Sequence, residues 1–216
     1  MNKRWWLLLV GLLGLGALTM LPGVAKTFDE NQDYVAILPE PEVAKPNDKI
    51  QVVEFFMHGC SHCYRFDPAL EQWLATKPHD VEFVRIPALF GRHFNMHAKA
   101  YYALQSLGKA EALHHAWFNE IHDKRNPLDT RKALDAFLAE QGVDMPQFEQ
   151  AMQSFAVATK VNRANTLLQR YDIRSVPSLV VDGRYKNNRG MAHDDMLLLI
   201  DDLVAKVREQ RTEEVR

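Results

Sequence analysis

Two hydrophobic patterns, one with the spacing of a strand and one with the spacing of a helix, flank the two cysteines of the chain. Residues 50–56 (IQVVEFF) form a short β-branched and aromatic run, which predicts a strand. After Cys63 the apolar side chains recur at helical spacing, which predicts a helix. These side chains are Phe66, Leu70, Trp73 and Leu74. The order of strand, turn and helix places Cys60 at or just before a helix N-terminus.

A long helical part follows. From residue 92 to about residue 170 the strand pattern disappears and helical spacing takes its place. Gly108, Pro127 and Gly142 interrupt this stretch. Because glycine and proline usually end helices, the pattern predicts an insertion of four or five helices.

The strand pattern returns near the end of the chain, at residues 178–185. Within it, Asp182-Gly183 predicts a hairpin with a two-residue turn. A last amphipathic helix follows, and its apolar stripe consists of Met196, Ile200, Leu203 and Val207. Residues 211–216 are polar, and we expect them to be a flexible tail.

The beginning of the chain has the pattern of an export signal. Lys3 and Arg4 precede an apolar stretch from Trp5 to Leu21, and a small-x-small site ends at Ala25. We expect cleavage after Ala25 and export of the rest of the chain. The alternative is an uncleaved membrane anchor, because the apolar stretch is long enough for a tilted membrane helix.

Composition and charge exclude two classes of protein. Of the 216 residues 47% are hydrophobic and 25% are charged, which is typical of a globular protein and excludes disorder throughout. The net charge of −2 excludes a generally basic nucleic-acid binder. The chain has only two cysteines, Cys60 and Cys63, and they must be explained together.

The spacing of the two cysteines indicates chemistry rather than a structural cross-link. A disulfide that encloses two residues constrains the unfolded chain little, because the stabilisation grows with loop length. A structural zinc site usually has four ligands, and only one Cys-x-x-Cys pair is present. His58 and His62 could supply nitrogen ligands, so metal capture at residues 60–63 remains an alternative.

A position at a helix N-terminus favours a thiolate at Cys60. The helix dipole supplies about 0.3–1 kcal/mol, whereas bringing a thiol pKa below neutrality takes roughly 2 kcal/mol. We expect the remainder to come from a protonated His62 and from a hydrogen bond donated by the Cys63 thiol. Cys60 is therefore predicted to be the exposed nucleophile and Cys63 the buried resolving thiol.

Glu54 is unusual because it lies inside the apolar run at residues 52–56. A charge there is unfavourable unless it is paired or protonated. One interpretation is an edge-strand carboxylate that faces water. The other is a buried base near Cys63 that helps to move the proton of that thiol. Arg85 lies in a similar run at residues 81–86 and is the candidate partner on the adjacent strand.

The other histidines indicate little chemistry. His93 and His97 are four residues apart, but no third ligand with suitable spacing accompanies them, so we predict no metal site. His114 and His115 are adjacent, face different sides of a helix and are expected at a solvated surface. The residues expected to fill the core or line an apolar groove are Met57, Met96, Tyr101 and Tyr102.

Two segments resemble the DsbA family of bacterial periplasmic thiol:disulfide oxidoreductases. Residues 54–66 (EFFMHGCSHCYRF) are similar to the family's active-site segment, and residues 174–185 (RSVPSLVVDGRY) to its cis-proline loop and the hairpin after it. The helical part lies between these motifs, as it does in the family. The resemblance implies an α/β chain with a thioredoxin-like fold and an inserted α-helical domain.

The resemblance also implies the domain limits. Residues 1–25 are the expected signal peptide, and residues 26–91 are the first part of the thioredoxin-like domain. Residues 92–160 are the inserted helical domain. Residues 161–210 are the second part of the thioredoxin-like domain, and residues 211–216 are the tail.

The catalytic residues implied by the resemblance are Cys60, Cys63, His62, Glu54 and Pro177. The Cys60–Cys63 disulfide is then the redox-active group, with no other cofactor and no metal. Glu54 matches the family's buried acid, and Arg85 falls near its basic partner.

The resemblance assigns substrate binding to Val176, Pro177 and His62. Val176-Pro177 is expected to be a cis peptide packed against the disulfide, with backbone groups that offer strand-like hydrogen bonds to a peptide. One departure concerns Ser61, because the commonest dipeptide between the family's cysteines is Pro-His. His62 is retained, so we expect an oxidising protein, but the value of the reduction potential stays open.

The implied activity is donation of the disulfide to unfolded exported proteins with free thiols in the periplasm. A DsbB-like membrane quinone-linked oxidase would reoxidise the protein. We expect a monomer and no nucleic-acid partner. The alternatives are a disulfide reductase or isomerase and, in a different class, a non-catalytic chaperone or metal-binding module.

Overall fold

The computed structural model describes residues 26–38 and 49–214. The signal peptide or anchor expected in residues 1–25 lies outside this part of the chain. No helix among the described residues is both long enough and apolar enough to cross a membrane.

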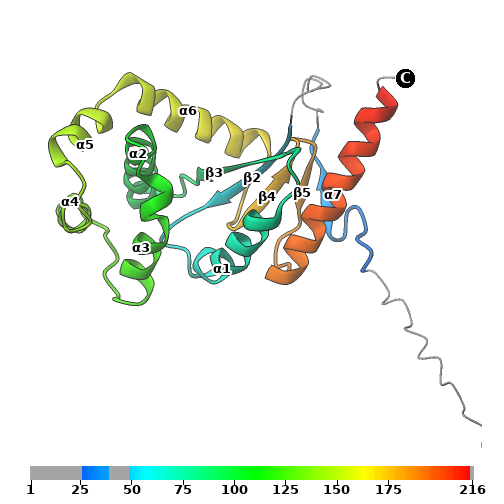
Figure 1. Cartoon of the computed structure of the whole chain (residues 1–216), viewed down its shortest axis with the longest axis horizontal. Helices are drawn as coiled ribbons and strands as arrows, with labels where there is room; N and C mark the ends of the chain where they lie inside the picture. Colours follow the sequence, from blue (N-terminus) through cyan, green and yellow to red (C-terminus); the bar gives the residue numbers. More distant parts are fainter. Residues whose placement is uncertain (1–25, 39–48, 215–216) are drawn as a thin grey trace, which may run out of the picture.

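Five strands form one mixed sheet in the order β1-β5-β4-β2-β3 (Figure 1). The strands are β1 (Tyr34–Ala36), β2 (Ile50–Phe56), β3 (Val81–Pro87), β4 (Ser178–Val181) and β5 (Tyr185–Asn187). β2 pairs parallel with β3 and antiparallel with β4, so it lies inside the sheet. The strand predicted at residues 50–56 is confirmed.

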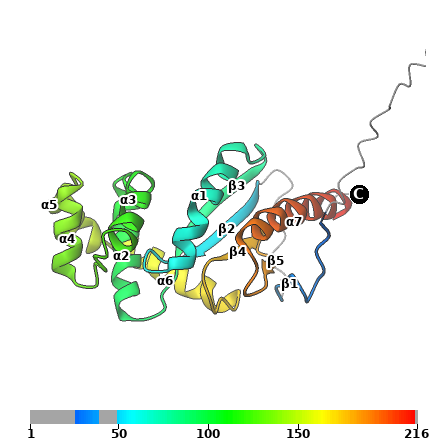
Figure 2. The ribbon, with the colours of Figure 1, turned by 90° about the horizontal axis from the view of Figure 1, so that it is seen from below.

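Two helices, α1 (Ser61–Thr76) and α7 (His193–Glu214), lie side by side on one face of the sheet (Figures 1 and 2). Side chains of β2 alternate between the two faces, as the pleat of a strand requires. Val52 belongs to a hydrophobic cluster that includes residues of α1 and α7. Val53 and Phe55 belong to a separate cluster that includes residues of the inserted helices. The helix predicted after Cys63 and the amphipathic last helix are both confirmed.

Five helices between β3 and β4 form a lobe beside the sheet (Figure 1). They are α2 (Arg92–Ser106), α3 (Ala110–His122), α4 (Arg131–Glu140), α5 (Met145–Met152) and α6 (Phe155–Arg170). This confirms the predicted helical insertion. The limit expected at residue 160 lies inside α6, which runs without a break toward the second half of the sheet.

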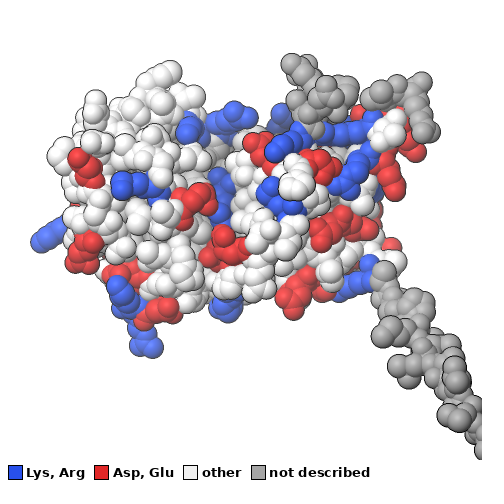
Figure 3. Space-filling model, in the orientation of Figure 1, with Lys and Arg blue, Asp and Glu red and all other residues white. Residues whose placement is uncertain are grey.

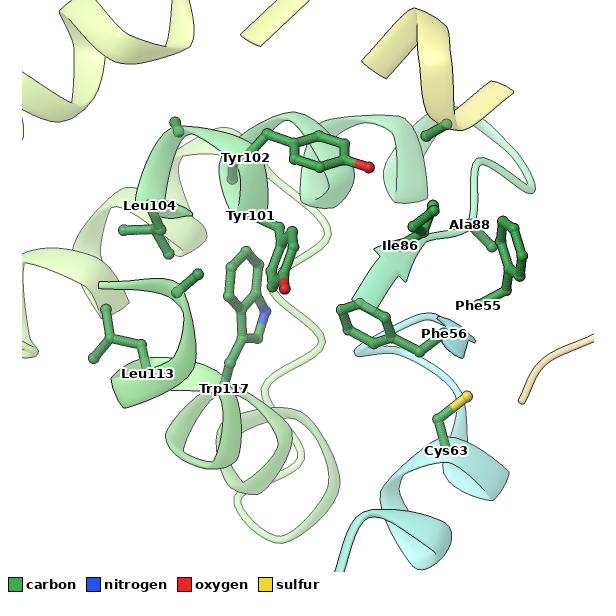
Figure 4. Close-up of a cluster of buried hydrophobic side chains, with 14 of the residues drawn as sticks. Phe55, Phe56, Cys63, Ile86, Ala88, Tyr101, Tyr102, Leu104, Leu113 and Trp117 are labelled. Atoms are coloured by element: carbon green, nitrogen blue, oxygen red, sulfur yellow. The ribbon is translucent and has the colours of Figure 1, made fainter. Parts of the chain in front are cut away.

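One hydrophobic cluster joins the lobe to the sheet. In Figure 4 the rings of Tyr101 and Trp117, from the lobe, face Phe56 and Ile86 of the sheet. Cys63 is part of the same cluster (Figure 4). The inserted helices and the cysteine pair therefore share one continuous core.

The expectation of a flexible tail at residues 211–216 is wrong for residues 211–214, which are helical. α7 continues to Glu214 because its last turn is bound to the β4–β5 hairpin. Arg211 forms an ion pair with Asp182 at 2.5 Å, and Arg184 one with Glu214 at 2.9 Å. Residues 215–216 lie outside the described part.

The predicted two-residue hairpin is only partly correct. Asp182 and Gly183 have positive φ values of 54° and 67°, as the tight turn requires, and Arg184 donates its amide hydrogen to the carbonyl of Val181. The strands, however, pair Val181 with Tyr185, which leaves Arg184 as an extra residue on one side. The ion pairs of Arg184 with Asp182 and Glu214 hold this register.

Candidate active site

The turn after β2 presents Cys60 at the N-terminus of α1. Cys60 is the N-cap residue, its amide donates to the carbonyl of Met57 at 3.0 Å, and the helix begins at Ser61. Cys63 lies in the first turn of the helix and is fully buried, whereas Cys60 is partly exposed. The two sulfurs are not bonded to each other. The geometry therefore corresponds to the reduced form, and Cys60 is the accessible thiol.

The two thiols have opposite electrostatic environments. A hydrogen bond from the Cys63 thiol makes the largest contribution to lowering the pKa of Cys60 from 9.0 to about 6, and it outweighs partial burial. The backbone amides of Cys63 and His62 and the charge of His62 add to this effect. Burial raises the pKa of Cys63 well above its ordinary value. At neutral pH the pair therefore holds a thiolate at Cys60 and a proton on Cys63.

His62 is exposed and has a partner that the sequence analysis did not consider. Nη2 of Arg65, one helical turn further along α1, lies 3.2 Å from Nδ1 of His62. The charge of His62 contributes to lowering the pKa of Cys60, as expected, but the hydrogen bond from the Cys63 thiol contributes more. The backbone amides of Cys63 and His62 also contribute more than this charge.

The loop before β4 closes the other side of the cysteine pair. The Val176-Pro177 peptide is cis, as expected. The thiol of Cys60 donates to the carbonyl of Val176, with the sulfur 3.6 Å from the oxygen. Residues more than a hundred positions apart are thus brought together at the accessible sulfur.

Glu54 is buried in the sheet and does not face water. It lies directly opposite Arg85 on the neighbouring strand, and both side chains are buried. Oε2 of Glu54 is 3.3 Å from Nε of Arg85, but these two atoms do not have hydrogen-bond geometry. Burial raises the pKa of Glu54 to about 7, although the charge of Arg85 opposes the rise. The burial of Glu54 and its partner Arg85 are confirmed, whereas its role as a base for Cys63 stays a prediction.

Arg85 is the centre of a larger ionic cluster that the sequence did not reveal. Besides Glu54 it contacts Asp67 and Glu71 of α1 and Glu111 of α3, with Asp67 at 3.7 Å and Glu111 at 2.6 Å. Asp67 is buried, whereas Glu71 and Glu111 are largely exposed. One guanidinium therefore connects the buried carboxyl group beside the cysteines to carboxylates at the surface.

A second buried group links the active-site turn to α3. Nε2 of His58 lies 3.2 Å from Nδ1 of His114, whose Nε2 lies 3.2 Å from a carboxylate oxygen of Asp67. The ring of His58 stacks on that of Trp117, with the ring centroids 4.2 Å apart. The backbone carbonyl oxygen of His58 lies 2.8 Å from Nε2 of His122. Burial lowers the pKa of His58 well below its ordinary value, so this ring is neutral.

The expectation that His114 lies at a solvated surface is wrong. His114 is buried because Asp67 provides an acceptor for its ring inside the protein. His115 is exposed, as expected, and lies 3.6 Å from Asp67. His97 is also buried, and its Nε2 contacts the carbonyl of Leu128 at 2.8 Å.

The remaining expectations concern metals and the core. Within residues 26–38 and 49–214, no three His, Cys, Asp or Glu side chains are grouped so that they could hold a metal ion. The predicted packing role of four residues is confirmed, because each belongs to the large hydrophobic cluster or packs against it. They are Met57, Met96, Tyr101 and Tyr102.

Comparison with known proteins agrees with this geometry. Residues 51–203 match the family model of the DSBA-like thioredoxin domain. The chain belongs to this family. Its fold is therefore thioredoxin-like with inserted helices, and the chain is a thiol:disulfide oxidoreductase.

Relatives and solved structures of the DsbA family match nearly the whole chain. The thiol:disulfide interchange protein DsbA of Pseudomonas aeruginosa is 36% identical over 204 residues, which are 94% of this chain and 96% of that protein. DsbA of Burkholderia cepacia is 40% identical over 177 residues, 80% of this chain and 82% of that protein. A crystal structure of Pseudomonas aeruginosa DsbA superposes with a TM-score of 0.79 at 36% identity, over 86% of this chain and 97% of that one.

The buried acid of this DsbA-family chain should make its stability depend on pH. In the unfolded chain the carboxyl group ionises near pH 4.5, but in the folded chain it ionises only near pH 7. Stability from this group is thus present below pH 4.5 and is lost as the pH rises through 7. We expect the free energy of unfolding of the reduced protein to fall by roughly 2–3 kcal/mol more in the wild type than in Glu54→Gln between pH 5 and 8.

Urea unfolding of the reduced proteins at both pH values measures this difference. Glu82→Gln is the matched control, because Glu82 is an exposed carboxylate on β3. The control should follow the wild type. An equal pH dependence in Glu54→Gln and in the wild type would show that Glu54 is ionised throughout this range.

Proposed function

We propose that the chain donates the Cys60–Cys63 disulfide to newly exported, unfolded proteins. The observation that carries the proposal is the contrast between an accessible Cys60 with a pKa of about 6 and a buried Cys63 with a raised pKa. A low thiol pKa makes Cys60 a good leaving group. Stabilisation of its thiolate also stabilises the reduced form of the protein, and this makes the disulfide oxidising.

The first step is attack of a substrate thiolate on the sulfur of Cys60. The Cys60–Cys63 bond breaks, a mixed disulfide forms, and the electron pair leaves on Cys63. Because the pKa of Cys63 is raised by burial and also by the charge of Glu54, this sulfur takes up a proton. With its pKa of about 7, Glu54 supplies that proton and takes it back during reoxidation.

The second step releases the substrate. Another substrate thiolate attacks the substrate sulfur of the mixed disulfide, and Cys60 leaves as a thiolate. Val176 and Pro177 hold the peptide by strand-like hydrogen bonds next to Cys60. His62 borders the same place and donates a hydrogen bond to Cys60 through its backbone amide. The substrate disulfide carries away two electrons fewer than its dithiol, and these electrons remain on the two cysteines.

The cellular setting is also part of the proposal. The family relationship supports a periplasmic location, with residues 1–25 as the export signal. A DsbB-like membrane oxidase linked to quinone then restores the disulfide. The chain acts as a monomer, without a metal or a cofactor other than its own disulfide.

Equilibration with glutathione tests the oxidising direction. We expect the Cys60–Cys63 couple to have a reduction potential more oxidising than about −200 mV, since the reduced form is the stabilised one. The fraction of reduced protein is measured by mass spectrometry after acid quenching and alkylation. A value below about −270 mV, in the range of a reductase, would overturn the proposal.

A further inference from the structure

A groove beside Cys60 combines an apolar wall with the positive side chain of Arg189. Its volume is about 270 Å³. Val176, Pro177 and Met191 contribute apolar surface, and Arg189 and His193 contribute polar groups. Because the carbonyl of Val176 contacts the thiol of Cys60, a peptide bound at that sulfur reaches this groove directly.

A second cavity of about 320 Å³ continues the groove. The two cavities share Ser175, Asn187 and Arg189, so Arg189 lies where they join. The second cavity also contains Lys186 and the pair of Arg174 with Asp172. The two cavities lie next to each other between Val176 and the end of β5 at Asn187. We call these two adjacent cavities the Arg189 groove.

Most charged groups along the Arg189 groove already have partners. Lys186 donates to two backbone carbonyls, and Arg174 pairs with Asp172 at 2.6 Å. Burial and the neighbouring charges of His62 and Arg65 lower the pKa of His193, which favours its neutral form.

Arg189 differs from these groups. It is exposed, and within residues 26–38 and 49–214 it forms no ion pair. Among the residues that the structure describes, Asp172 is the only carboxylate that lines either cavity, and Arg174 and Lys186 both lie beside it. In this part of the chain the guanidinium of Arg189 thus has no ionic partner, and it lines the groove next to Cys60.

One face of the molecule shows no patch of a single charge (Figure 3). Over the face drawn in Figure 3, positive and negative side chains are interspersed rather than gathered by sign. Without Lys3 and Arg4 of the expected signal peptide the net charge is −4, so long-range attraction does not favour acidic substrates. A preference for acidic side chains therefore has to come from groups near Cys60.

We propose that the Arg189 groove selects substrate segments that carry an acidic side chain within a few residues of the reacting cysteine. Arg189 pairs with that carboxylate, while the apolar wall packs against a neighbouring side chain. The inference rests on the proposed disulfide donation and adds the class of substrate. An exposed pair of this kind changes a rate constant by about two- to fivefold.

The test uses three peptides that contain the same two cysteines and differ only at the two positions that flank the first cysteine. Both positions hold glutamate in one peptide, glutamine in the second and lysine in the third. The oxidised protein is mixed with each peptide, and the second-order rate constant of peptide oxidation is measured by mass spectrometry. Each value is divided by the rate constant of the same peptide with oxidised glutathione, which corrects for the reactivity of the peptide thiol.

We expect the glutamate peptide to react about two- to fivefold faster than the glutamine peptide, and the lysine peptide to be the slowest. Arg189→Glu should reverse this order, and 0.5 M salt should reduce the differences. Lys132→Glu is the matched control, because Lys132 is an exposed cation on α4, away from both cavities. This variant should keep the wild-type order.

The possible failures are distinguishable. If the wild type oxidises all three peptides at the same corrected rate, the preference for acidic substrates is wrong and disulfide donation stands. If Lys132→Glu changes the order as much as Arg189→Glu does, the assignment to Arg189 is wrong. If the protein oxidises none of the peptides while oxidised glutathione does, the proposed function itself fails.

Discussion

Replacing Cys63 with alanine is expected to abolish disulfide donation while Cys60 remains a reactive thiol. The variant cannot form the internal disulfide, so it has nothing to donate. Cys60 is still partly exposed at the N-terminus of α1, where backbone amides stabilise its thiolate. The pKa of Cys60 should rise above its value of about 6, because the hydrogen bond from Cys63 is its largest stabilising contribution.

The reciprocal variant, Cys60→Ala, should be almost inert. Its remaining thiol, Cys63, is fully buried and has a raised pKa, so little thiolate is present and reagents cannot reach it. We expect iodoacetamide at pH 7 to alkylate Cys63→Ala at least about a hundredfold faster than Cys60→Ala. The difference combines the larger thiolate fraction of Cys60 with its greater exposure to the reagent. Intact mass spectrometry over time measures both rates. Equal rates would show that the two sulfurs do not have the separate roles assigned to them.

The pairing of Glu54 with Arg85 was accessible from the sequence because each is a single charge inside an apolar run of strand type. When two such runs are neighbouring strands, aligning their apolar positions brings the two charges opposite each other, and the observed register does this. The position of Cys60 was predictable for a similar reason, since a strand followed closely by a helix leaves few places for the turn. The cis peptide at Pro177 came from family resemblance and not from any periodic pattern.

The contacts between distant elements could not be predicted in this way. His58, His114 and Asp67 come from the active-site turn, α3 and α1, and their contact depends on how the lobe docks against the sheet. Helical spacing predicts which residues share a face of α3. The apolar neighbours of His114 in the sequence do not show that the carboxylate of Asp67 on α1 lies within reach of its ring. The end of α7 was missed for the same reason. Its polar residues look like a frayed terminus until the hairpin supplies Asp182 and Arg184 as partners.

Replacing Arg85 with alanine is expected to lower the free energy of unfolding by about 3–5 kcal/mol, because two buried carboxyl groups lose their cation. Glu54 and Asp67 are both buried, and both contact Arg85 in the wild type. The charge of Arg85 also lowers the pKa of Glu54, so its removal raises that pKa further. The loss of stability should therefore be larger at pH 8, where the carboxyl group of Glu54 is ionised in the wild type, than at pH 5, where it is neutral.

Urea unfolding of the reduced protein at both pH values tests this expectation, and Arg85→Lys is the conservative control because it keeps the charge. Adding Glu54→Gln to Arg85→Ala should restore part of the stability at pH 8, since the unpaired carboxylate is then gone. If the loss were the same at both pH values and unaffected by Glu54→Gln, the role of Arg85 would be packing of its side chain alone. A pH-dependent loss that Glu54→Gln relieves would instead show that Arg85 keeps Glu54 able to ionise inside the sheet. The proposed exchange of a proton between Glu54 and Cys63 requires this ability.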